Sequence, residues 1–286
     1  QMIDGKAVSL AVKTDVRDAI AKAGIEPCLA VILVGNDPAS RVYVNNKKKA
    51  CAFCGIRSLE YALPEETTQE ALLDLIDKLN RDPAVNGILC QLPVPKQISE
   101  KEVIAKIDPK KDVDCFHNEN VGRLWTGSYR ILPCTPAGVM ALLDHYHIDP
   151  AGKHCVIVGR SNIVGKPMAQ LMLQKEHGDA TVTICHSHSK TLKEECRQAD
   201  IIIAAIGRPN FVTADMVKDG AVVIDVGTTR VEDPNSKTGY RLNGDVKFDE
   251  VAPKCSYITP VPGGVGPMTI CSLMKNTLTA AKGCFR

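Results

Sequence analysis

Short apolar runs recur along the chain, and a turn and a helix-like stretch follow each of them. Predicted strands cover 29–34, 87–91, 155–159, 181–185, 201–206 and 222–226. A predicted helix at 67–80 has apolar residues at helical spacing, namely Ala71, Leu72, Leu75, Ile76 and Leu79. This alternation is typical of an α/β fold. The run 201–206 is apolar on both faces, as strands of a parallel sheet are when helices cover both sides. The sequence therefore predicts a mostly parallel sheet.

The length of 286 residues corresponds to about two domains of ordinary size. The segment Pro133-Cys134-Thr135-Pro136 leads into a predicted helix at 137–145. We therefore place a domain boundary near residue 138. The segment 232–243 is rich in proline, asparagine, serine and glycine, and it is predicted to be an exposed loop.

Composition excludes several classes of partner. The net charge is +2 and the chain has one Trp and five Phe, so it offers no basic stripe interleaved with aromatics for nucleic acid. The longest apolar runs hold six residues, far fewer than the roughly 20 that cross a membrane. Small molecules are the expected partners.

Twelve cysteines are scattered along the chain, which does not suit a disulfide scaffold. Cys51 and Cys54 form one C-x-x-C, and Cys185 lies beside His186 and His188, but no second C-x-x-C pair accompanies them. Ordinary buried thiols are favoured over a metal site, so no metal is predicted. Reduced thiols and a start without a secretory signal indicate a cytoplasmic protein. The Gln that precedes the first Met leaves a mitochondrial location open.

The clearest motif is 156–167, Val-Ile-Val-Gly-Arg-Ser-Asn-Ile-Val-Gly-Lys-Pro, which reads as a strand, a tight turn and a helix start. Such a turn lets backbone N–H groups approach a pyrophosphate. It departs from G-x-G-x-x-G, because Ser161 replaces the second glycine and the last, Gly165, comes one residue late. A plain strand-to-helix turn is the alternative interpretation.

The second strand of this half ends in His186-Ser187-His188-Ser189-Lys190, without the carboxylate that binds the ribose hydroxyls of NAD. Hydroxyls, imidazoles and a lysine, together with Arg160 on the neighbouring loop, suit a 2′-phosphate. The segment favours NADP, and a polar exit from the strand is the alternative. A catalytic base at His186 or His188 is less favoured, because both are expected at the adenosine end.

Tyr43 and Lys47 are four residues apart in a predicted helix and share one of its faces. A phenol and an amine could point into one pocket, although Lys48 and Lys49 make a solvated face the alternative. Gln91 precedes Leu92 and Pro93, so it is expected at the carboxyl end of a strand, where open α/β sheets bind ligands.

Two further segments could serve a site. Asp112 and Asp114 lie in a charged turn, for which a solvated loop is the alternative. The Pro/Gly segment 259–269 is a rigid loop whose backbone can approach a ligand closely, and a simple connection is the alternative.

Together these segments resemble the bifunctional methylenetetrahydrofolate dehydrogenase/methenyltetrahydrofolate cyclohydrolase family. The resemblance covers nearly the whole chain. It rests on Tyr43-x-x-x-Lys47, Gln91-Leu92-Pro93-Val94-Pro95, Asp112-Val113-Asp114, Pro133-Cys134-Thr135-Pro136, Gly159-Arg160-Ser161 through Val164-Gly165, Asp225-Val226-Gly227 and the run from Pro260 to Thr269.

The resemblance implies oxidation of 5,10-methylenetetrahydrofolate with NADP and hydration of the methenyl product to 10-formyltetrahydrofolate in the same cleft. It implies an α/β folate-binding catalytic domain at 1–138 and a Rossmann-like, parallel-sheet NADP-binding domain at 139–268. The last helix, within 269–286, is expected to return to the N-terminal domain. A homodimer joined through the nucleotide domains is also implied.

Site residues carried over from the resemblance fall into three groups. The catalytic residues are Lys47, Gln91 and Asp114. Contacts to the folate are expected from Tyr43, Lys47, Cys90, Gln91, Leu92, Asp114, Pro262, Gly263, Gly264, Val265 and Gly266. Contacts to NADP are expected from Gly159, Arg160, Ser161, Gly165, Ser187 and Thr228.

A carboxylate at Asp114 can accept two hydrogen bonds from a pterin ring. Hydride transfer needs alignment rather than a protein acid. Hydration needs a group that moves protons, and a partly buried Lys47 suits that role.

Two positions depart from the family pattern. Cys115 follows Asp114 where the family usually has Gly, which could alter the turn that aims the carboxylate. His188 stands where Arg or Lys is more frequent, which bears on the contact with the 2′-phosphate. The competing hypotheses are a dehydrogenase of the shikimate or amino-acid type, a non-catalytic nucleotide sensor, and a family member that keeps one activity or uses NAD.

Overall fold

The computed structural model describes residues 1–236 and 239–283, which form two compact units. The N-terminal unit comprises Leu10–Cys134 and the chain from Ile270 onward. The C-terminal unit comprises Gln1–Ser9 and Thr135–Thr269. The first nine residues thus group with the later part of the chain, whereas the sequence suggested a single domain over 1–138. The backbone accounts for this, because Ile3 N donates to Ile258 O over 2.8 Å.

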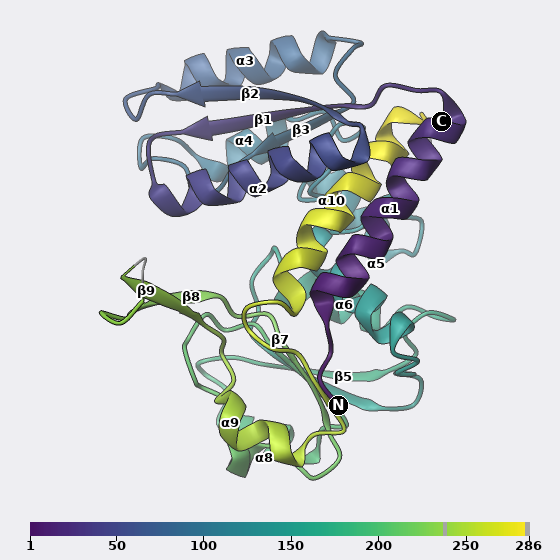
Figure 1. The fold of residues 1–286 in the computed structure, drawn as a ribbon, viewed down its shortest axis with the longest axis vertical. Coiled ribbons are helices and arrows are strands. Elements are labelled where there is room, and N and C mark those ends of the chain that lie inside the picture. Colours follow the sequence, from purple (N-terminus) through teal and green to yellow (C-terminus); the bar gives the residue numbers. More distant parts are fainter. Residues whose placement is uncertain (237–238, 284–286) are drawn as a thin grey trace. The chain divides into compact units, whose positions relative to one another are not determined.

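The elements follow one another in an α/β order (Figure 1). The helices are α1 (Gly5–Ala23), α2 (Pro38–Cys54), α3 (Gln69–Arg81), α4 (Glu100–Lys106), α5 (Asn118–Trp125), α6 (Cys134–His145), α7 (Gly165–Met172), α8 (Leu192–Gln198), α9 (Phe248–Val251) and α10 (Val265–Ala281), with 3₁₀ turns η1 (Ala214–Met216) and η2 (Ala252–Lys254). The strands are β1 (Cys28–Val34), β2 (Arg57–Leu63), β3 (Gly87–Cys90), β4 (His154–Val158), β5 (Thr181–Cys185), β6 (Ile201–Ala204), β7 (Val222–Asp225), β8 (Thr229–Glu232), β9 (Tyr240–Asn243) and β10 (Tyr257–Ile258).

The N-terminal unit is built on a parallel sheet with strand order β2-β1-β3. Every residue of the central strand β1 is buried, which explains its unbroken apolar sequence. One face packs against α3 and α4, and the other packs against α1, α2 and α10. Figure 1 shows α2 and α3 on opposite sides of this sheet.

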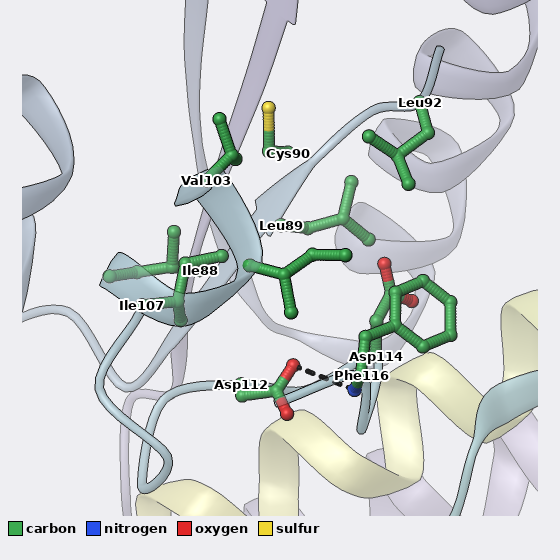
Figure 2. A pocket seen from close by; sticks show the side chains of 10 residues that line it. Ile88, Leu89, Cys90, Leu92, Val103, Ile107, Asp112, Asp114 and Phe116 are labelled. Atoms are coloured by element: carbon green, nitrogen blue, oxygen red, sulfur yellow. Dashed lines mark hydrogen bonds between the residues drawn. The ribbon is translucent and has the colours of Figure 1, made fainter. Parts of the chain in front are cut away.

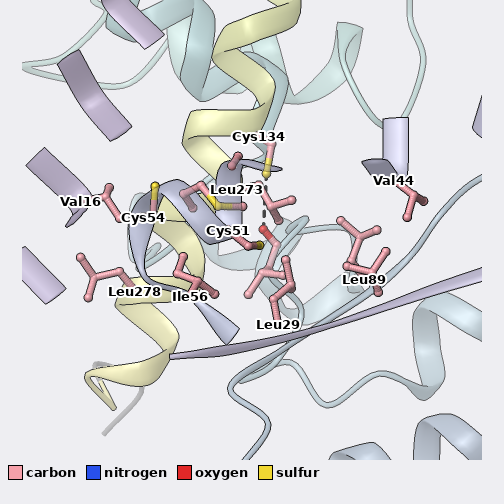
Figure 3. Packing of buried hydrophobic residues seen from close by; sticks show 14 of the residues in the cluster. Val16, Leu29, Val44, Cys51, Cys54, Ile56, Leu89, Cys134, Leu273 and Leu278 are labelled. Atoms are coloured by element: carbon pink, nitrogen blue, oxygen red, sulfur yellow. Dashed lines mark hydrogen bonds between the residues drawn. The ribbon is translucent and has the colours of Figure 1, made fainter. Parts of the chain in front are cut away.

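Helix α10 supplies part of the core of the N-terminal unit. Its Leu273 and Leu278 lie in one cluster with Leu29 and Leu89 from the sheet and with Cys51 from α2 (Figure 3). Burying such side chains stabilises the fold by about 1.5–3 kcal/mol each. The last helix therefore belongs to the same core as β1 and α2.

Local sequence signals define helix α2, which carries two of the predicted site residues. Asp37 caps its start by accepting a hydrogen bond from Ser40 N over 2.7 Å, and Pro38 occupies the first helical turn. Gly55, at φ +76°, ends the helix. The spacing argument for Tyr43 and Lys47 therefore applies to a real helix.

The C-terminal unit contains a five-stranded parallel sheet with strand order β10-β7-β6-β4-β5. Strands β5 and β6 follow each other in the chain but lie on opposite sides of β4, so the chain reverses direction across the sheet at β4. In open α/β sheets, ligands bind outside the carboxyl end of the strands at such a point. The loops after β4 and β6 are therefore the expected ligand-binding edge of this unit.

The predicted α/β fold with parallel sheets is confirmed, and each of the six predicted strands is found with similar bounds. The predicted exposed loop at 232–243 is confirmed for the turn at 233–236 and wrong at its ends, Glu232 and 240–243, which are strand residues. Strands β8 and β9 pair there as an antiparallel hairpin whose residues are half-buried or exposed, so its polar composition resembled that of a loop. Residues 237 and 238 of that segment lie outside the described residues. Strand β2 was missed because it forms a sheet edge and carries charged residues.

Within the ranges 1–236 and 239–283, none of the helices combines the length and the apolar character that a membrane crossing requires.

Candidate active site

Lys47 and Gln91 meet in the N-terminal unit, although they are 44 residues apart in the chain. Lys47 Nζ donates to Gln91 Oε1 over 2.9 Å. Gln91 directly follows β3, and its backbone N–H donates to Ile32 O over 2.8 Å. Its side-chain Nε2 donates to Leu92 O over 2.9 Å, which leaves Oε1 as the atom directed at the amine. The amide is thus fixed at both ends, and its oxygen holds the lysine nitrogen in place.

The neighbouring lysine has a different environment. Lys48 is exposed and pairs with Glu60, which Arg41 also contacts. The hydrogen bond from Lys48, followed by that from Arg41, holds the pKa of Glu60 below its ordinary value. Lys47 is half-buried, and no ion pair involves it within the described part of the chain. The solvated-face interpretation therefore fits Lys48 and not Lys47.

Tyr43 lies one helical turn before Lys47 and is 43% exposed. Its ring is available to a ligand on the same face of α2 as the amine.

The two acidic residues of the turn after α4 differ in their environment. Asp112 is buried and accepts hydrogen bonds from His117 N at 2.8 Å, Phe116 N at 3.2 Å and Asn120 Nδ2 at 2.8 Å. Asp114 is only partly buried, and the thiol of Cys134 contacts its Oδ1 at 3.7 Å. Asp112 therefore organises the turn, whereas Asp114 keeps accepting capacity for another molecule.

Burial raises the pKa of Asp114 above its ordinary value, and the positive charge of Lys47 opposes this effect. Lys47 and Asp114 thus influence each other electrostatically, even though they come from a helix and from a turn more than 60 residues apart. The structure brings Tyr43, Lys47, Gln91 and Asp114 together in one unit.

A small cavity lies along the edge strand β3, beside Asp114 (Figure 2). Its lining is mostly apolar and comprises Ile88, Leu89, Cys90, Leu92, Val103, Ile104, Ile107, Asp112, Asp114 and Phe116. Burial raises the pKa of the Cys90 thiol to about 12, so this side chain stays a neutral, apolar wall. The cavity itself has room for about one water molecule, so its relevance to a site is the apolar wall that it places beside the Asp114 carboxylate.

Cys115 adopts a left-handed conformation with φ +62°, which favours glycine. Its buried thiol donates to Ile131 O over 3.6 Å. The turn after Asp114 therefore forms with Cys at the position where the resemblance led us to expect Gly.

In the C-terminal unit, the loop after β4 has the features of a pyrophosphate-binding turn. Gly159 has φ +131°, and a Cβ there would lie 2.1 Å from Ala205 O on the loop after β6. Ser161 Oγ accepts from Val164 N at 3.1 Å and from Gly165 N at 3.3 Å, at the start of α7. Close packing of two strand ends and the N-terminus of α7 fits a dinucleotide here.

The other residues predicted to bind NADP flank this turn. Arg160, Ser187 and Thr228 are exposed on the loops after β4, β5 and β7. His186 Nδ1 accepts from His188 N over 3.2 Å, so its Nε2 is left for other partners. Partial desolvation and then the charges of Arg160 and His188 lower the pKa of His186. This grouping of a guanidinium, imidazoles and hydroxyls fits a phosphate.

Two buried carboxylates, Asp245 and Asp225, hold the backbone of the loops after β6 and β7. No role for either was predicted from the sequence. Asp245 Oδ2 accepts from Ile206 N at 2.7 Å and from Gly207 N at 2.9 Å. Asp225 accepts from Gly227 N, Asp245 N and Val246 N, each at 2.9 Å. Burial raises the pKa of Asp225 to about 7. An acidic residue at the end of a buried strand was the available signal for Asp225.

The Pro/Gly run 262–266 lies in the C-terminal unit, just before and at the start of α10. Gly264 is buried, and a Cβ there would lie 2.6 Å from Pro260 O. Gly263 has φ +106°. The backbone of this loop is therefore closely packed, and its contact with a folate stays a prediction.

Family models match almost the whole chain. The model described as "Tetrahydrofolate dehydrogenase/cyclohydrolase, catalytic domain" matches residues 3–114, and the one described as "Tetrahydrofolate dehydrogenase/cyclohydrolase, NAD(P)-binding domain" matches residues 133–285. The "Bifunctional protein FolD" of Phocaeicola vulgatus is 60% identical over 287 residues, which cover 99% of this chain and 98% of that protein.

Solved structures are similar over the same length. The bifunctional enzyme FolD, methylenetetrahydrofolate dehydrogenase/cyclohydrolase, of Campylobacter jejuni has a TM-score of 0.92 and 50% identity, covering 99% of each chain. The Trypanosoma brucei N5,N10-methylenetetrahydrofolate dehydrogenase-cyclohydrolase, complexed with NADP cofactor and inhibitor, has a TM-score of 0.95 and 42% identity, covering 100% of this chain and 98% of that chain.

Proposed function

This chain belongs to the tetrahydrofolate dehydrogenase/cyclohydrolase family, and on that premise we propose how its own residues serve the two reactions. The enzyme oxidises 5,10-methylenetetrahydrofolate to 5,10-methenyltetrahydrofolate with NADP and hydrolyses the methenyl product to 10-formyltetrahydrofolate. The observation that carries the assignment of roles is the hydrogen bond from Lys47 Nζ to Gln91 Oε1.

Asp114 orients the folate. Its carboxylate accepts hydrogen bonds from the 2-amino and ring N–H groups of the pterin, which fixes the direction of the ring. Cys90 and Leu92, which lie beside Asp114, provide apolar side chains for contact with that ring. Tyr43, exposed on α2, stacks against the substrate on the side of Lys47.

Lys47 moves the protons of hydration. The oxygen of water bonds to the methenyl carbon, and the neutral amine accepts the proton that the water loses. The ammonium then donates that proton to the ring nitrogen whose bond to the carbon breaks, and the hydroxyl on that carbon releases its own proton to solvent as the formyl C=O forms. Gln91 accepts from Nζ throughout and keeps the amine pointed at the reacting atoms.

NADP supplies the hydride acceptor of the dehydrogenase step. The chain's contribution is alignment. Gly159, Ser161 and Gly165 form the turn at which the pyrophosphate is held. Arg160 and Ser187 meet the 2′-phosphate, and Thr228 contacts the cofactor from the loop after β7.

The experiment follows both reactions in the purified protein. The absorbance of NADPH is recorded with 5,10-methylenetetrahydrofolate and either NADP or NAD, and the decay of methenyltetrahydrofolate absorbance is recorded without cofactor. We expect both activities and a preference for NADP. Loss of either activity, or a preference for NAD, would contradict the proposal.

The proposal also includes a homodimer and a cytoplasmic location. Strand β5 is an edge of its sheet, and Ile184 on it is 37% exposed, which supports association through the nucleotide-binding domains. Sedimentation equilibrium of the wild type and of Ile184→Lys tests this: a dimer that Ile184→Lys weakens is expected, and a monomeric wild type would contradict it.

A further inference from the structure

Asn276 joins two backbone segments that are distant from it in the chain. It lies on α10 and is buried, with 6% of its surface exposed. Its Nδ2 donates to Val113 O and to Leu132 O, each over 2.8 Å, across 163 and 144 residues. A primary amide has two N–H donors. Both are therefore used on these two carbonyls.

Both segments lead into the surroundings of Asp114. The carbonyl of Val113 belongs to the peptide group that ends in Asp114 N, so a fixed Val113 carbonyl fixes the peptide plane before Asp114. Leu132 lies two residues before Cys134, whose thiol contacts Val113 O at 3.5 Å and Asp114 Oδ1 at 3.7 Å.

Among the residues that the structure describes, few contacts hold the direction of the Asp114 carboxylate. The neighbouring Asp112 is fixed by two backbone N–H groups and by Asn120. The contact recorded for the Asp114 carboxylate is a long one to a thiol, which is a weak donor. Its orientation therefore depends on the backbone that precedes it and on the left-handed turn at Cys115.

We propose that Asn276 is a positioning residue for the folate: it holds the backbone at Val113 and Leu132 so that the Asp114 carboxylate keeps the direction in which it meets the pterin ring. This inference rests on the proposed role of Asp114 in folate binding. Asn276 does not itself touch the substrate. A misplacement of about 1 Å at an orienting group can cost up to about 10²-fold in rate or affinity.

The test compares two neighbouring buried residues of α10. Asn276→Ala removes both donors and leaves room for water to meet the two carbonyls. Thr277→Val is the matched control, because Thr277 is fully buried and its hydroxyl bonds within the helix, to Leu273 O at 2.8 Å. For each variant we measure the Kd of tetrahydrofolate and of NADP by calorimetry, kcat and KM of both reactions, and the midpoint of thermal unfolding.

We expect the two variants to differ in their affinity for tetrahydrofolate. Asn276→Ala raises the Kd of tetrahydrofolate roughly 10- to 100-fold and raises the folate KM of both reactions, with NADP binding unchanged. Thr277→Val lowers the unfolding midpoint but leaves both dissociation constants at wild-type values. If Asn276→Ala does not fold, Asn276→Ser is read in the same way. Wild-type affinity for tetrahydrofolate in a folded Asn276 variant, or an equal loss in Thr277→Val, overturns the inference.

A double-mutant comparison separates this inference from the function on which it rests. In an Asp114→Ala background, Asn276→Ala is expected to cause no further loss of tetrahydrofolate affinity, because its target is gone. A further loss as large as in the wild type overturns the positioning role and leaves the role of Asp114 intact. Wild-type affinity in Asp114→Ala alone contradicts the proposed role of Asp114 and overturns the inference with it.

Discussion

Asp112 and Asp114 lie two residues apart, and their carboxylates have different kinds of partner. Asp112 accepts from the backbone of Phe116 and His117 and from the side chain of Asn120, so its hydrogen-bonding capacity is spent inside the turn. The Cys134 thiol contacts Asp114 Oδ1 at 3.7 Å. The positive charge of Lys47 favours the ionised form of this carboxyl. One carboxylate builds the turn, and the other is presented to the substrate.

Asp114→Ala is expected to lower the dehydrogenase and cyclohydrolase rates in parallel, because both reactions need the same oriented ring. NADP binding is retained, since the cofactor residues lie on the other unit. Steady-state rates of both reactions and calorimetry with NADP check this. A loss confined to one activity would show that Asp114 does not serve a shared pocket.

Arg160→Ala is expected to weaken NADP by about 1.5–3 kcal/mol, the value of a hydrogen bond to a charged group, and to change NAD little. The exposed Arg197 on α8, which donates to Asp215 O, offers a control that removes the same charge from the same unit. Fluorescence titration of each variant with both nucleotides gives the comparison. Equal losses for NADP and NAD would remove Arg160 from the 2′-phosphate site.

The raised pKa of Asp225 makes the free energy of unfolding depend on pH. Burial raises its pKa in the folded protein to about 7, from an ordinary value of 3.8. The folded state therefore binds more protons than the unfolded state between these values, and the unfolding free energy falls as pH rises through this window. The full contribution is about 4 kcal/mol.

Asp225→Asn cannot ionise, so its unfolding free energy should fall less between pH 5 and pH 8 than that of the wild type, by about 2–3 kcal/mol. Its stability at pH 5 should also be lower, because the Asn amide places an NH2 donor where one carboxyl oxygen of Asp225 accepts a backbone N–H. Urea unfolding at the two pH values measures both effects, with the exposed Asp219→Asn as control. Equal slopes in Asp225→Asn and wild type would refute the titration.

Sequence patterns predicted the strands that are buried on both faces, such as β1 and β6, because a parallel strand under helices has no polar positions. Strand β2 and the hairpin β8–β9 could not be found in this way, since one side of each remains open to solvent. Their composition is shared with loops.

The individual site residues could be predicted from the sequence, but the contacts between residues from different elements could not. Helical spacing placed Tyr43 with Lys47, but nothing local joins Lys47 to Gln91, because parallel sheet packing brings β3 beside α2. The roles of Asp245 and Asn276 were also out of reach, since each acts on backbone groups far away in the chain. Hydrogen bonds of this kind leave no periodic signal.

Substitutions at Cys115 test whether glycine is needed at this left-handed position of the turn after Asp114. A left-handed conformation costs an L-residue about 1–2 kcal/mol, while glycine adds about 0.5–1 kcal/mol of unfolded-chain entropy. Because these effects oppose each other, Cys115→Gly should change the unfolding free energy by less than about 1 kcal/mol and leave the folate KM unchanged. Cys115→Val, which is β-branched at φ +62°, should be less stable and bind folate more weakly. An increased folate KM in Cys115→Gly would contradict this reading of the turn.

Lys47 is proposed to transfer the protons of hydration, and the neighbouring Lys48 serves as the control. Lys47→Met keeps similar bulk but cannot ionise, whereas Lys48→Met removes an equal charge from an exposed residue that pairs with Glu60. General acid–base help is typically about 10²- to 10⁴-fold in rate. Hydration of methenyltetrahydrofolate should fall by that factor in Lys47→Met, and hydride transfer should fall less.

The most direct measurement is the rate of methenyltetrahydrofolate hydrolysis across pH in wild type, Lys47→Met, Lys48→Met and Gln91→Ala. We expect Lys47→Met to lose hydrolysis and its pH dependence, Gln91→Ala to shift the pH profile, and Lys48→Met to match wild type. A Lys47→Met enzyme that hydrolyses methenyltetrahydrofolate at the wild-type rate would show that the amine held by Gln91 is not the proton-transferring group.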